Sequence, residues 1–355
     1  MKVTLFLLLI LLAPMLMISL VRADSNEQWV KFPGNPVLTP TPNGWDSDFV
    51  TSPVVLFDGA AYRMWYVGGH ATGIGIGYAN SSDGITWKKY PEAVLSPGSP
   101  GSWDSSRVTI GSVLWNGTLF LMAYRGENAT TFANGAIGVA ASKDGISWVK
   151  YSGNPIMTPG LADSFMGEPF AIRWQTTYNM WYAGKSANDP SIIRILYATS
   201  ANGIKWTKWP TPVLSPSSDP NAWDSATVTS PSVARQDADF GLWYTGLNQS
   251  GTNPQIGYAT STDGVGWSKS VQNPILPLGL PDSWDSAGVE QPGVVKGANG
   301  YMMYYDGFNA TSAARIGLAY APQNFTVPEL MVPQFGFLVA LLVCATGCYV
   351  NRKRA

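Results

Sequence analysis

One line of sequence recurs about every 60 residues, and this repeat limits the folds open to the chain. The line IGYANSSDGITW at 76–87 returns as IGVAASKDGISW (137–148), ILYATSANGIKW (195–206) and IGYATSTDGVGW (256–267). A fifth copy begins as IGLAYAPQNF at 316–325 and then stops. Two shorter lines recur with the same period, one built on Met-Trp-Tyr and one on Trp-Asp-Ser. The repeat indicates five structural units of one kind.

Each unit is expected to contain four short strands. Apolar runs rich in aromatic and β-branched residues, with an Asp-Gly turn before the last strand, are typical of antiparallel β-structure. These strands are apolar on both faces and need cover on both sides, which a ring of stacked sheets provides. The predicted fold class is all-β, a five-bladed β-propeller over residues 29–326. Its blades are expected at roughly 41–97, 98–159, 160–216, 217–277 and 278–326.

The start of this region repeats a passage from its middle. Residues 29–40 read WVKFPGNPVLTP, and residues 148–159 read WVKYSGNPIMTP. The fifth unit lacks this passage at its own end. We therefore expect residues 29–40 to form the missing strand of the last blade. This strand would close the ring and remove an exposed sheet edge.

Both ends of the chain differ in composition from the repeats. Residues 1–23 contain Lys2, an apolar run and then Val21-Arg22-Ala23, which predicts a secretory signal peptide, with an uncleaved anchor as the alternative. Residues 334–350 are apolar and precede a basic tail at 351–355. They predict a transmembrane anchor after a linker at 327–333, with a buried core helix as the alternative. The expected location is the extracellular face of the cell membrane, with a single C-terminal anchor.

Charge and cysteine content exclude several classes of function. The net charge is -1 and no long basic run lies inside the chain, so a nucleic-acid partner is not expected. Both cysteines fall in the predicted anchor, so the exported domain has no disulfide. One histidine and no calcium-loop spacing predict no metal site and no cofactor, with a Ca²⁺ ion in the central channel left open. We expect a monomer. Glycan acceptor sites occur at Asn80, Asn116, Asn128, Asn248, Asn309 and Asn324.

Residues used once per blade are expected to be scaffold, so functional residues are sought where the repeat breaks. The aspartate of each Trp-Asp-Ser line is expected to bond to backbone and order its loop. In the first strand, one column reads Ser52, Gly111, Glu168, Ser230 and Gln291, so it holds one carboxylate. Further candidates lie near the start of the first strand or the end of the second, which are expected to share a rim: Asp48, Arg107, Glu290, His70, Arg125, Glu127, Lys185 and Asp306.

The region 29–326 resembles the five-bladed propeller superfamily of glycoside hydrolases, with the arabinanases, invertases and levansucrases of families 43, 32, 68 and 130. The resemblance rests on GNPVL at 34–38, SPVVLFDGAAYRMWYVGG at 52–69 and the Ser-x-Asp-Gly-x-x-Trp turns. It implies a catalytic aspartate in blade one, a supporting aspartate in blade two and a general-acid glutamate in blade three. Glu168 in GEPF matches the acid. The two aspartate positions hold Ser52 and Gly111-Ser112 in this chain.

Glycoside cleavage normally requires two carboxyl groups that flank the scissile bond. We therefore expect a cell-surface, glycoside hydrolase-like protein that acts on an oligosaccharide or polysaccharide at a central funnel. Glu168 would act with Asp48 or Glu290, and the substrate would contact Ser52, Arg107, Arg125, Glu127, His70, Lys185, Gln291 and Asp306. Two alternatives stay open, a sugar-binding propeller without catalysis and a structural or adhesive surface protein. Glycans at Asn128, Asn248 and Asn309 would favour the last, because they would crowd the funnel.

Overall fold

The structure is a computed structural model that describes residues 29–70, 73–128, 135–160, 163–186, 189–236, 239–298 and 300–321. Every regular element in these ranges is a β-strand, as the repeat predicts. The predicted signal peptide, linker, anchor and basic tail lie outside the described residues, as do residues 322–326 of the predicted propeller. Among the described residues, no helix is long and apolar enough to cross a membrane.

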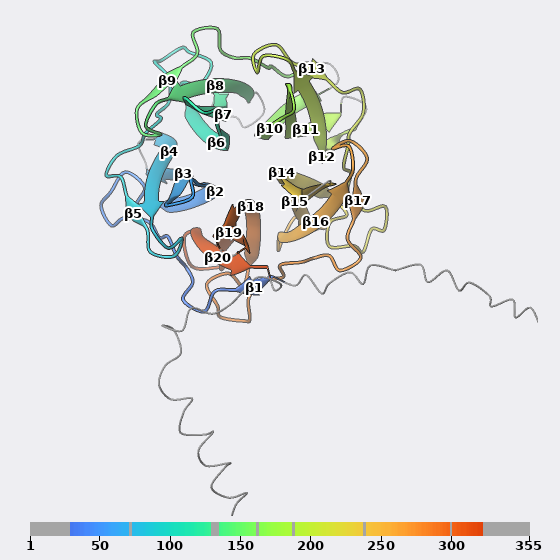
Figure 1. Cartoon of the computed structure of the whole chain (residues 1–355). Coiled ribbons are helices and arrows are strands. Elements are labelled where there is room, and N and C mark those ends of the chain that lie inside the picture. Colours follow the sequence, from blue (N-terminus) through green and yellow to red (C-terminus); the bar gives the residue numbers. More distant parts are fainter. Residues whose placement is uncertain are drawn as a thin grey trace, which may run out of the picture.

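Twenty strands form five groups of four, and Figure 1 shows these groups as a ring around a central axis. The inner strands are β2 (Phe49–Phe57), β6 (Arg107–Trp115), β10 (Asp163–Trp174), β14 (Thr227–Gln236) and β18 (Gly288–Gly297). The second strands are β3 (Tyr62–His70), β7 (Phe120–Glu127), β11 (Thr177–Ser186), β15 (Asp239–Leu247) and β19 (Gly300–Phe308). This arrangement is a five-bladed β-propeller.

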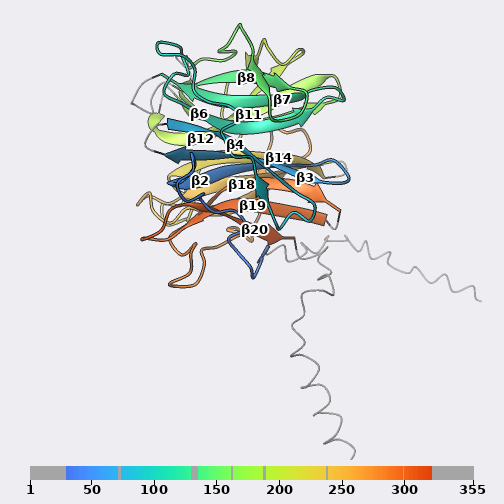
Figure 2. The same cartoon turned by 90° about the vertical axis from the view of Figure 1, so that its left-hand side faces the viewer.

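The remaining strands complete each blade towards the outside. The third strands are β4 (Gly73–Ser81), β8 (Ala136–Ser142), β12 (Asp189–Ser200), β16 (Gln255–Ser261) and β20 (Arg315–Tyr320). The short outer strands are β5 (Lys88–Lys89), β9 (Trp148–Lys150), β13 (Thr207–Lys208), β17 (Ser268–Lys269) and β1 (Val30–Lys31). Neighbours within a blade are antiparallel, as in β2-β3-β4-β5. In the side view of Figure 2 the first and last inner strands, β2 and β18, lie next to each other and are in contact.

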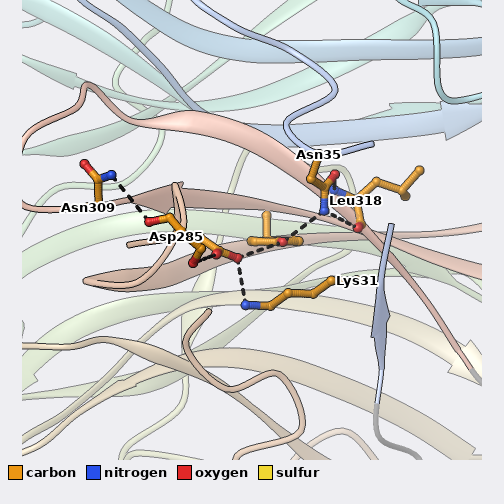
Figure 3. Close-up of polar contacts among 7 residues, drawn as sticks. Lys31, Asn35, Asp285, Asn309 and Leu318 are labelled. Carbon is orange, nitrogen blue, oxygen red and sulfur yellow. Dashed lines mark hydrogen bonds and ion pairs between the residues drawn. The ribbon is translucent and has the colours of Figure 1, made fainter. Parts of the chain in front are cut away.

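The ring is closed by the segment that begins at Trp29. Val30 and Lys31 pair with Tyr320 and Ala319, so β1 is the outer strand of the last blade, and the predicted pairing is confirmed. The side chain of Asn35 adds two hydrogen bonds to the backbone of Leu318, each 2.8 Å long, and Figure 3 shows them. Backbone bonds between Leu38 and Ile316 extend the contact along the same edge.

Each Trp-Asp-Ser aspartate is buried and bonds to a tyrosine and a lysine of its blade. The five sets are Asp46 with Tyr66 and Lys89, Asp104 with Tyr124 and Lys150, Asp163 with Tyr182 and Lys208, Asp224 with Tyr244 and Lys269, and Asp285 with Tyr305 and Lys31. The expected bond to backbone occurs in two sets, to the amides of Thr41 and Gly160. The prediction was incomplete, because the tyrosine and lysine stand in other repeated lines that the strand pairing brings alongside the aspartate.

Aromatic side chains of three second strands, those of blades one, three and five, donate a hydrogen bond to the next blade. Trp65 donates from Nε1 to the carbonyl of Gly145 (2.7 Å), Trp181 donates to Gly264 (2.8 Å), and the hydroxyl of Tyr304 donates to Gly84 (2.7 Å). Trp243 holds the same place in the fourth blade, and its Nε1 is buried without a partner in the described chain. It packs edge-on against Trp29 at 6.2 Å between ring centroids.

Candidate functional site

The starts of the inner strands and the ends of the second strands meet at one edge of the ring, the rim. The register pairs Phe49 with Gly69, and the amide of Asp48 donates to the carbonyl of Gly69 (3.0 Å). The rim expected from the sequence is therefore present. Asp48 and His70 are exposed there and face each other, with 3.1 Å between Oδ1 and Nδ1. Both residues belong to blade one and lie at the outer opening of the site.

Every inner strand has an irregular register at the same level. The shifts lie between Thr51 and Val54, Ile110 and Ser112, Met166 and Pro169, Thr229 and Ser232, and Glu290 and Gly293. Bulges of this kind turn side chains away from the regular pleat, here towards the axis. Ser52, Ser230 and Gln291 adopt left-handed φ angles of 54°, 50° and 53° at these bulges. Together with Gly111 and Glu168 they line a cavity of about 30 Å³ on the axis, the hub.

The hub is narrow and leaves no room for a side chain at Gly111. A Cβ atom at that position would overlap the carbonyl oxygen and the ring of Pro169 in the next blade. The hydroxyl of the adjacent Ser112 accepts a hydrogen bond from the amide of Ala171 (2.9 Å), which ties blade two to blade three. The blade-two aspartate of the resembling enzymes therefore has no space here. A cavity of this volume holds about one water molecule, so a sugar ring would have to bind on the rim side of the hub.

Three carboxyl groups gather beside the hub. Glu290 and Asp306 face each other across the β18–β19 pair. Burial raises the pKa of Glu290 to about 7, and the negative charge of Glu168 adds to this rise. Burial also raises the pKa of Asp306 well above its usual value, and the charges of Glu290 and Glu168 act in the same direction. At neutral pH this cluster therefore holds protons that isolated carboxylates would have lost.

Asp306 also joins the last blade to the first. Both of its carboxyl oxygens accept from the amide of Ser52, at 2.8 and 3.0 Å. The hydroxyl of Ser52 donates to the side-chain oxygen of Gln291, and the amide of Gln291 donates to the hydroxyl of Thr245 (2.8 Å). Ser52 and Gln291, two residues predicted to contact a substrate, are thus bonded to each other at the hub.

A buried arginine, Arg125, interacts electrostatically with Glu168. Arg125 donates from Nε to the carbonyl of Met166 (2.6 Å) and forms an ion pair with Glu127. Arg107 binds the same glutamate, with 2.8 Å between Nε and Oε2. Burial lowers the pKa of Arg125, while attraction to Glu168 and Glu127 opposes this change. Glu168 therefore interacts electrostatically with a guanidinium group and with the carboxyl groups of Glu290 and Asp306.

Lys185 is the remaining predicted contact residue. Its Nζ lies 5.8 Å from the ring centre of Phe165, and the guanidinium of Arg125 lies 5.1 Å from the same ring. The structure thus groups Glu168, Glu290, Asp306, Arg125, Ser52 and Gln291 at the hub, with Arg107, Glu127 and Lys185 adjoining and Asp48 and His70 at the outer rim. In the described ranges, the polar contacts of the Asp48 carboxyl are with Ser47 and His70.

Thr245 was missed at the sequence level, although a signal for it exists. Its column in the second strands reads Val67, Arg125, Ala183, Thr245 and Asp306, so this column is as irregular as the one that contains Glu168. No three His, Cys, Asp or Glu side chains of the described chain converge to hold a metal ion.

Two curated proteins match the chain over 225 residues. They are uncharacterized protein MT1551 and uncharacterized protein Rv1502, from two strains of Mycobacterium tuberculosis. Each is 31% identical, and each match spans 61% of this chain and 72% of the relative. The chain belongs to the family of these two proteins. No protein-family model matches this member of the family.

Solved structures that resemble this family member show its fold. One is described as a glycoside hydrolase, with 17% identity, a TM-score of 0.67 and coverage of 84% of this chain and 95% of the other. A second is described with the words that the GH130 family of mannoside phosphorylases contains glycoside hydrolases that target β-1,2 mannosidic linkages in Candida mannan. It has 18% identity, a TM-score of 0.64 and coverage of 86% of this chain and 97% of the other. A third is a thermostable family-43 glycoside hydrolase, with 17% identity, a TM-score of 0.63 and coverage of 83% of this chain and 100% of the other. The expected fold resemblance is confirmed.

Proposed function

We propose that the hub and its rim form the site of a carbohydrate-active protein of the glycoside hydrolase type, with Glu168 and Glu290 as its pair of carboxyl groups. The observation that carries this proposal is the pKa of Glu290, which burial and the charge of Glu168 raise to about 7. A carboxyl group that titrates near neutral pH can keep a proton and release it to a leaving oxygen. The second carboxyl group must then be ionised.

The electrostatic surroundings assign the two roles. Glu290 lies among carboxyl groups and retains its proton, so it would protonate the glycosidic oxygen. Glu168 interacts with the positive charge of Arg125, so we assign it the role of the base or the nucleophile. This assignment reverses the role that the resemblance implies for Glu168. The assignment rests on the raised pKa of Glu290, on its pairing with Asp306 and on the attraction between Arg125 and Glu168.

Location and substrate are part of the same proposal. The apolar segments at 1–23 and 334–350 support secretion and a C-terminal membrane anchor. β20 ends beside the start of β19, at the edge of the ring opposite the rim. The anchor would therefore leave the propeller on the face away from the site. One similar structure concerns enzymes that target β-1,2 mannosidic linkages, so β-1,2-mannosides are the first substrates to assay, with and without inorganic phosphate.

The test uses the full chain in detergent and two variants, Glu290→Gln and Glu168→Gln. Loss of a general acid or base typically slows turnover by about 10²–10⁴-fold, so both variants should lose hydrolysis of oligosaccharides. With a nitrophenyl glycoside, whose leaving group needs no proton, Glu290→Gln should regain much of its rate and Glu168→Gln should not. The exposed Glu92 provides the control, as Glu92→Gln. Unchanged turnover by Glu168→Gln would contradict the proposed catalytic activity.

Sugar binding without catalysis is the second candidate. It is favoured by Ser52 and Gly111, which occupy the two aspartate positions, and by the small volume of the hub. Calorimetric titration that detects oligosaccharide binding while chromatography detects no product would establish it. A structural or adhesive role is the third reading, and Asn248 and Asn309 directly follow β15 and β19 at the rim. Glycopeptide mapping that finds both sites fully occupied would favour that role.

A further inference from the structure

An open surface depression with a volume of about 490 Å³ lies away from the hub in the fourth blade. One wall is the connector 213–218, which leads from blade three into blade four. The other walls are Trp223 and Asp224 at the start of the blade and Trp267, Lys269 and Asn273 near its outer strand β17. We call it the connector pocket. Its volume falls in the range of pockets that bind small molecules.

One carboxyl oxygen in the connector pocket lacks a donor. Asp224 is buried, with 2% of its surface exposed, and its Oδ2 accepts from Tyr244 (3.1 Å) and Lys269 (2.6 Å). No group in the described chain donates to its Oδ1. In the other four blades this oxygen accepts a bond from the Thr41 amide, the Ser102 hydroxyl, the Gly160 amide or the Ser283 hydroxyl. Blade four therefore differs from its copies at an acceptor that lines a pocket.

The sequence explains this difference. Ala222 occupies the position before the tryptophan where blades two and five have the donors Ser102 and Ser283. The connector is also longer, with eight residues (215–222) between Leu214 and Trp223 and seven (96–102) between Leu95 and Trp103. The amides of Gly98, Ser217 and Gly279 bond to the carbonyl of the aspartate in blades two, four and five alike, and in blades two and five the glycine lies directly against the aspartate side chain. Blade four therefore differs by the missing serine, by Ser217 in place of the glycine and by the added residue.

The lining of the pocket indicates the kind of ligand. Trp223 has one ring face stacked on Tyr244, and both Trp223 and Trp267 are partly exposed. Serine hydroxyls at Ser215 and Ser218 are exposed in the opposite wall. A cation is disfavoured, because Lys269 already neutralises the carboxylate at 2.6 Å. Indole rings, hydroxyls and one acceptor without a donor suit an uncharged molecule that carries many hydroxyl groups.

We propose that the connector pocket binds a neutral saccharide unit, one hydroxyl of which donates to Oδ1 of Asp224. The choice of a sugar rests on the proposed function, whereas the existence of a ligand site rests on the pocket and the open acceptor. Oδ1 is not among the fully buried atoms that lack a partner, so it is open to solvent in the pocket, and a bound hydroxyl would donate to it in place of water. The pocket is distinct from the hub, so the protein would hold a glycan at two points.

The experiment restores the missing donor. Ala222→Ser should place a hydroxyl on Oδ1 of Asp224, as in blades two and five. Titration calorimetry of the full chain in detergent, with mannotriose, xylotriose and arabinotriose as probes, should then show at least about tenfold weaker binding at this site. The indole N–H signals of Trp223 and Trp267 identify the site by NMR. Ser218→Tyr, which fills the pocket from an exposed position, should have the same effect, and Ala60→Ser in an exposed loop should have none.

The outcomes separate this inference from the function of the hub. Probe binding that shifts the two indole signals and is lost in Ala222→Ser, but is kept in Glu168→Gln, supports the connector pocket even if no hydrolysis is found. Binding that survives in both Ala222→Ser and Ser218→Tyr overturns it. Wild-type protein whose Trp223 and Trp267 signals are unchanged by all three probes overturns it as well, whatever happens at the hub.

Discussion

Lys31 places its Nζ atom 2.7 Å from Oδ2 of Asp285 and so joins residues that are 254 positions apart in the chain (Figure 3). Asp285 is buried and also accepts from the hydroxyls of Tyr305 and Ser283. In the other four blades the corresponding lysine belongs to the same repeat as its aspartate. The last blade thus takes a charged partner, as well as a strand, from the front of the chain.

Replacement of Lys31 by methionine should loosen this closure. The change leaves the buried Asp285 carboxylate without its cation, and because Lys31 is partly exposed we expect a loss of about 2 kcal/mol in the free energy of unfolding. Urea denaturation followed by tryptophan fluorescence measures it. Val30→Thr, in the same strand but exposed, is the matched control and should be close to neutral. Equal stability of the two variants would show that the ion pair does not contribute to closure.

Gly111→Ala should be strongly destabilising. The added Cβ would overlap the Pro169 carbonyl, so blades two and three must separate, at a cost of about 3 kcal/mol or more. Gly266→Ala tests the same change where the nearest atom is 3.8 Å away, and it should have little effect. Thermal unfolding of both variants decides the matter. A Gly111→Ala protein as stable as the control would mean that the hub can widen without strain.

Stability should fall as the pH rises towards neutral, and Glu290 should account for part of this fall. Burial raises the pKa of Glu290 from 4.5 to about 7, so the folded state binds a proton more tightly than the unfolded state. The stabilisation is complete below pH 4.5 and disappears as the pH passes 7. Glu290→Gln should flatten this dependence by an amount on the order of a few kcal/mol, whereas Glu92→Gln should not. Denaturation midpoints between pH 4 and pH 8 that fall equally in wild type and Glu290→Gln would exclude Glu290 as the source.

The two buried tryptophans of blades one and four should respond differently to the same mutation. Trp65→Phe removes the hydrogen bond to Gly145, which should cost about 1 kcal/mol more than Trp243→Phe. The Nε1 atom of Trp243 has no acceptor in the described ranges, so its loss removes a buried donor and no bond. Chemical denaturation of the pair provides the comparison. A larger loss for Trp243→Phe would indicate that its indole has an acceptor after all.

The repeat and the closing strand could be predicted from the sequence, because aligned copies show directly which strand the last unit lacks. The facing positions of Glu290 and Asp306 also follow from strand pairing once the second strand is aligned with the first. The pairing could not show how Asp48 is directed, since that depends on the exposed turn beside His70. It could not show that Pro169 fills the space above Gly111, since this contact joins two blades. Oδ1 of Asp224 lacks a donor because Ala222 stands where blades two and five have Ser102 and Ser283. The alanine gives no signal by itself, and its effect is visible only when the three blades are compared.

The pairing of β1 with β20 affects how the protein must be made. Of the strands in the described ranges, β1 is synthesised first and its partner β20 is synthesised last. Four sheets can form in the order in which their strands are synthesised. The fifth sheet is complete only when β1 pairs with β20, which is synthesised after the four other blades. Until then the nascent chain has an unpaired edge on β20, and the loop to be closed spans almost the entire propeller. Ring closure is therefore a single late step in folding.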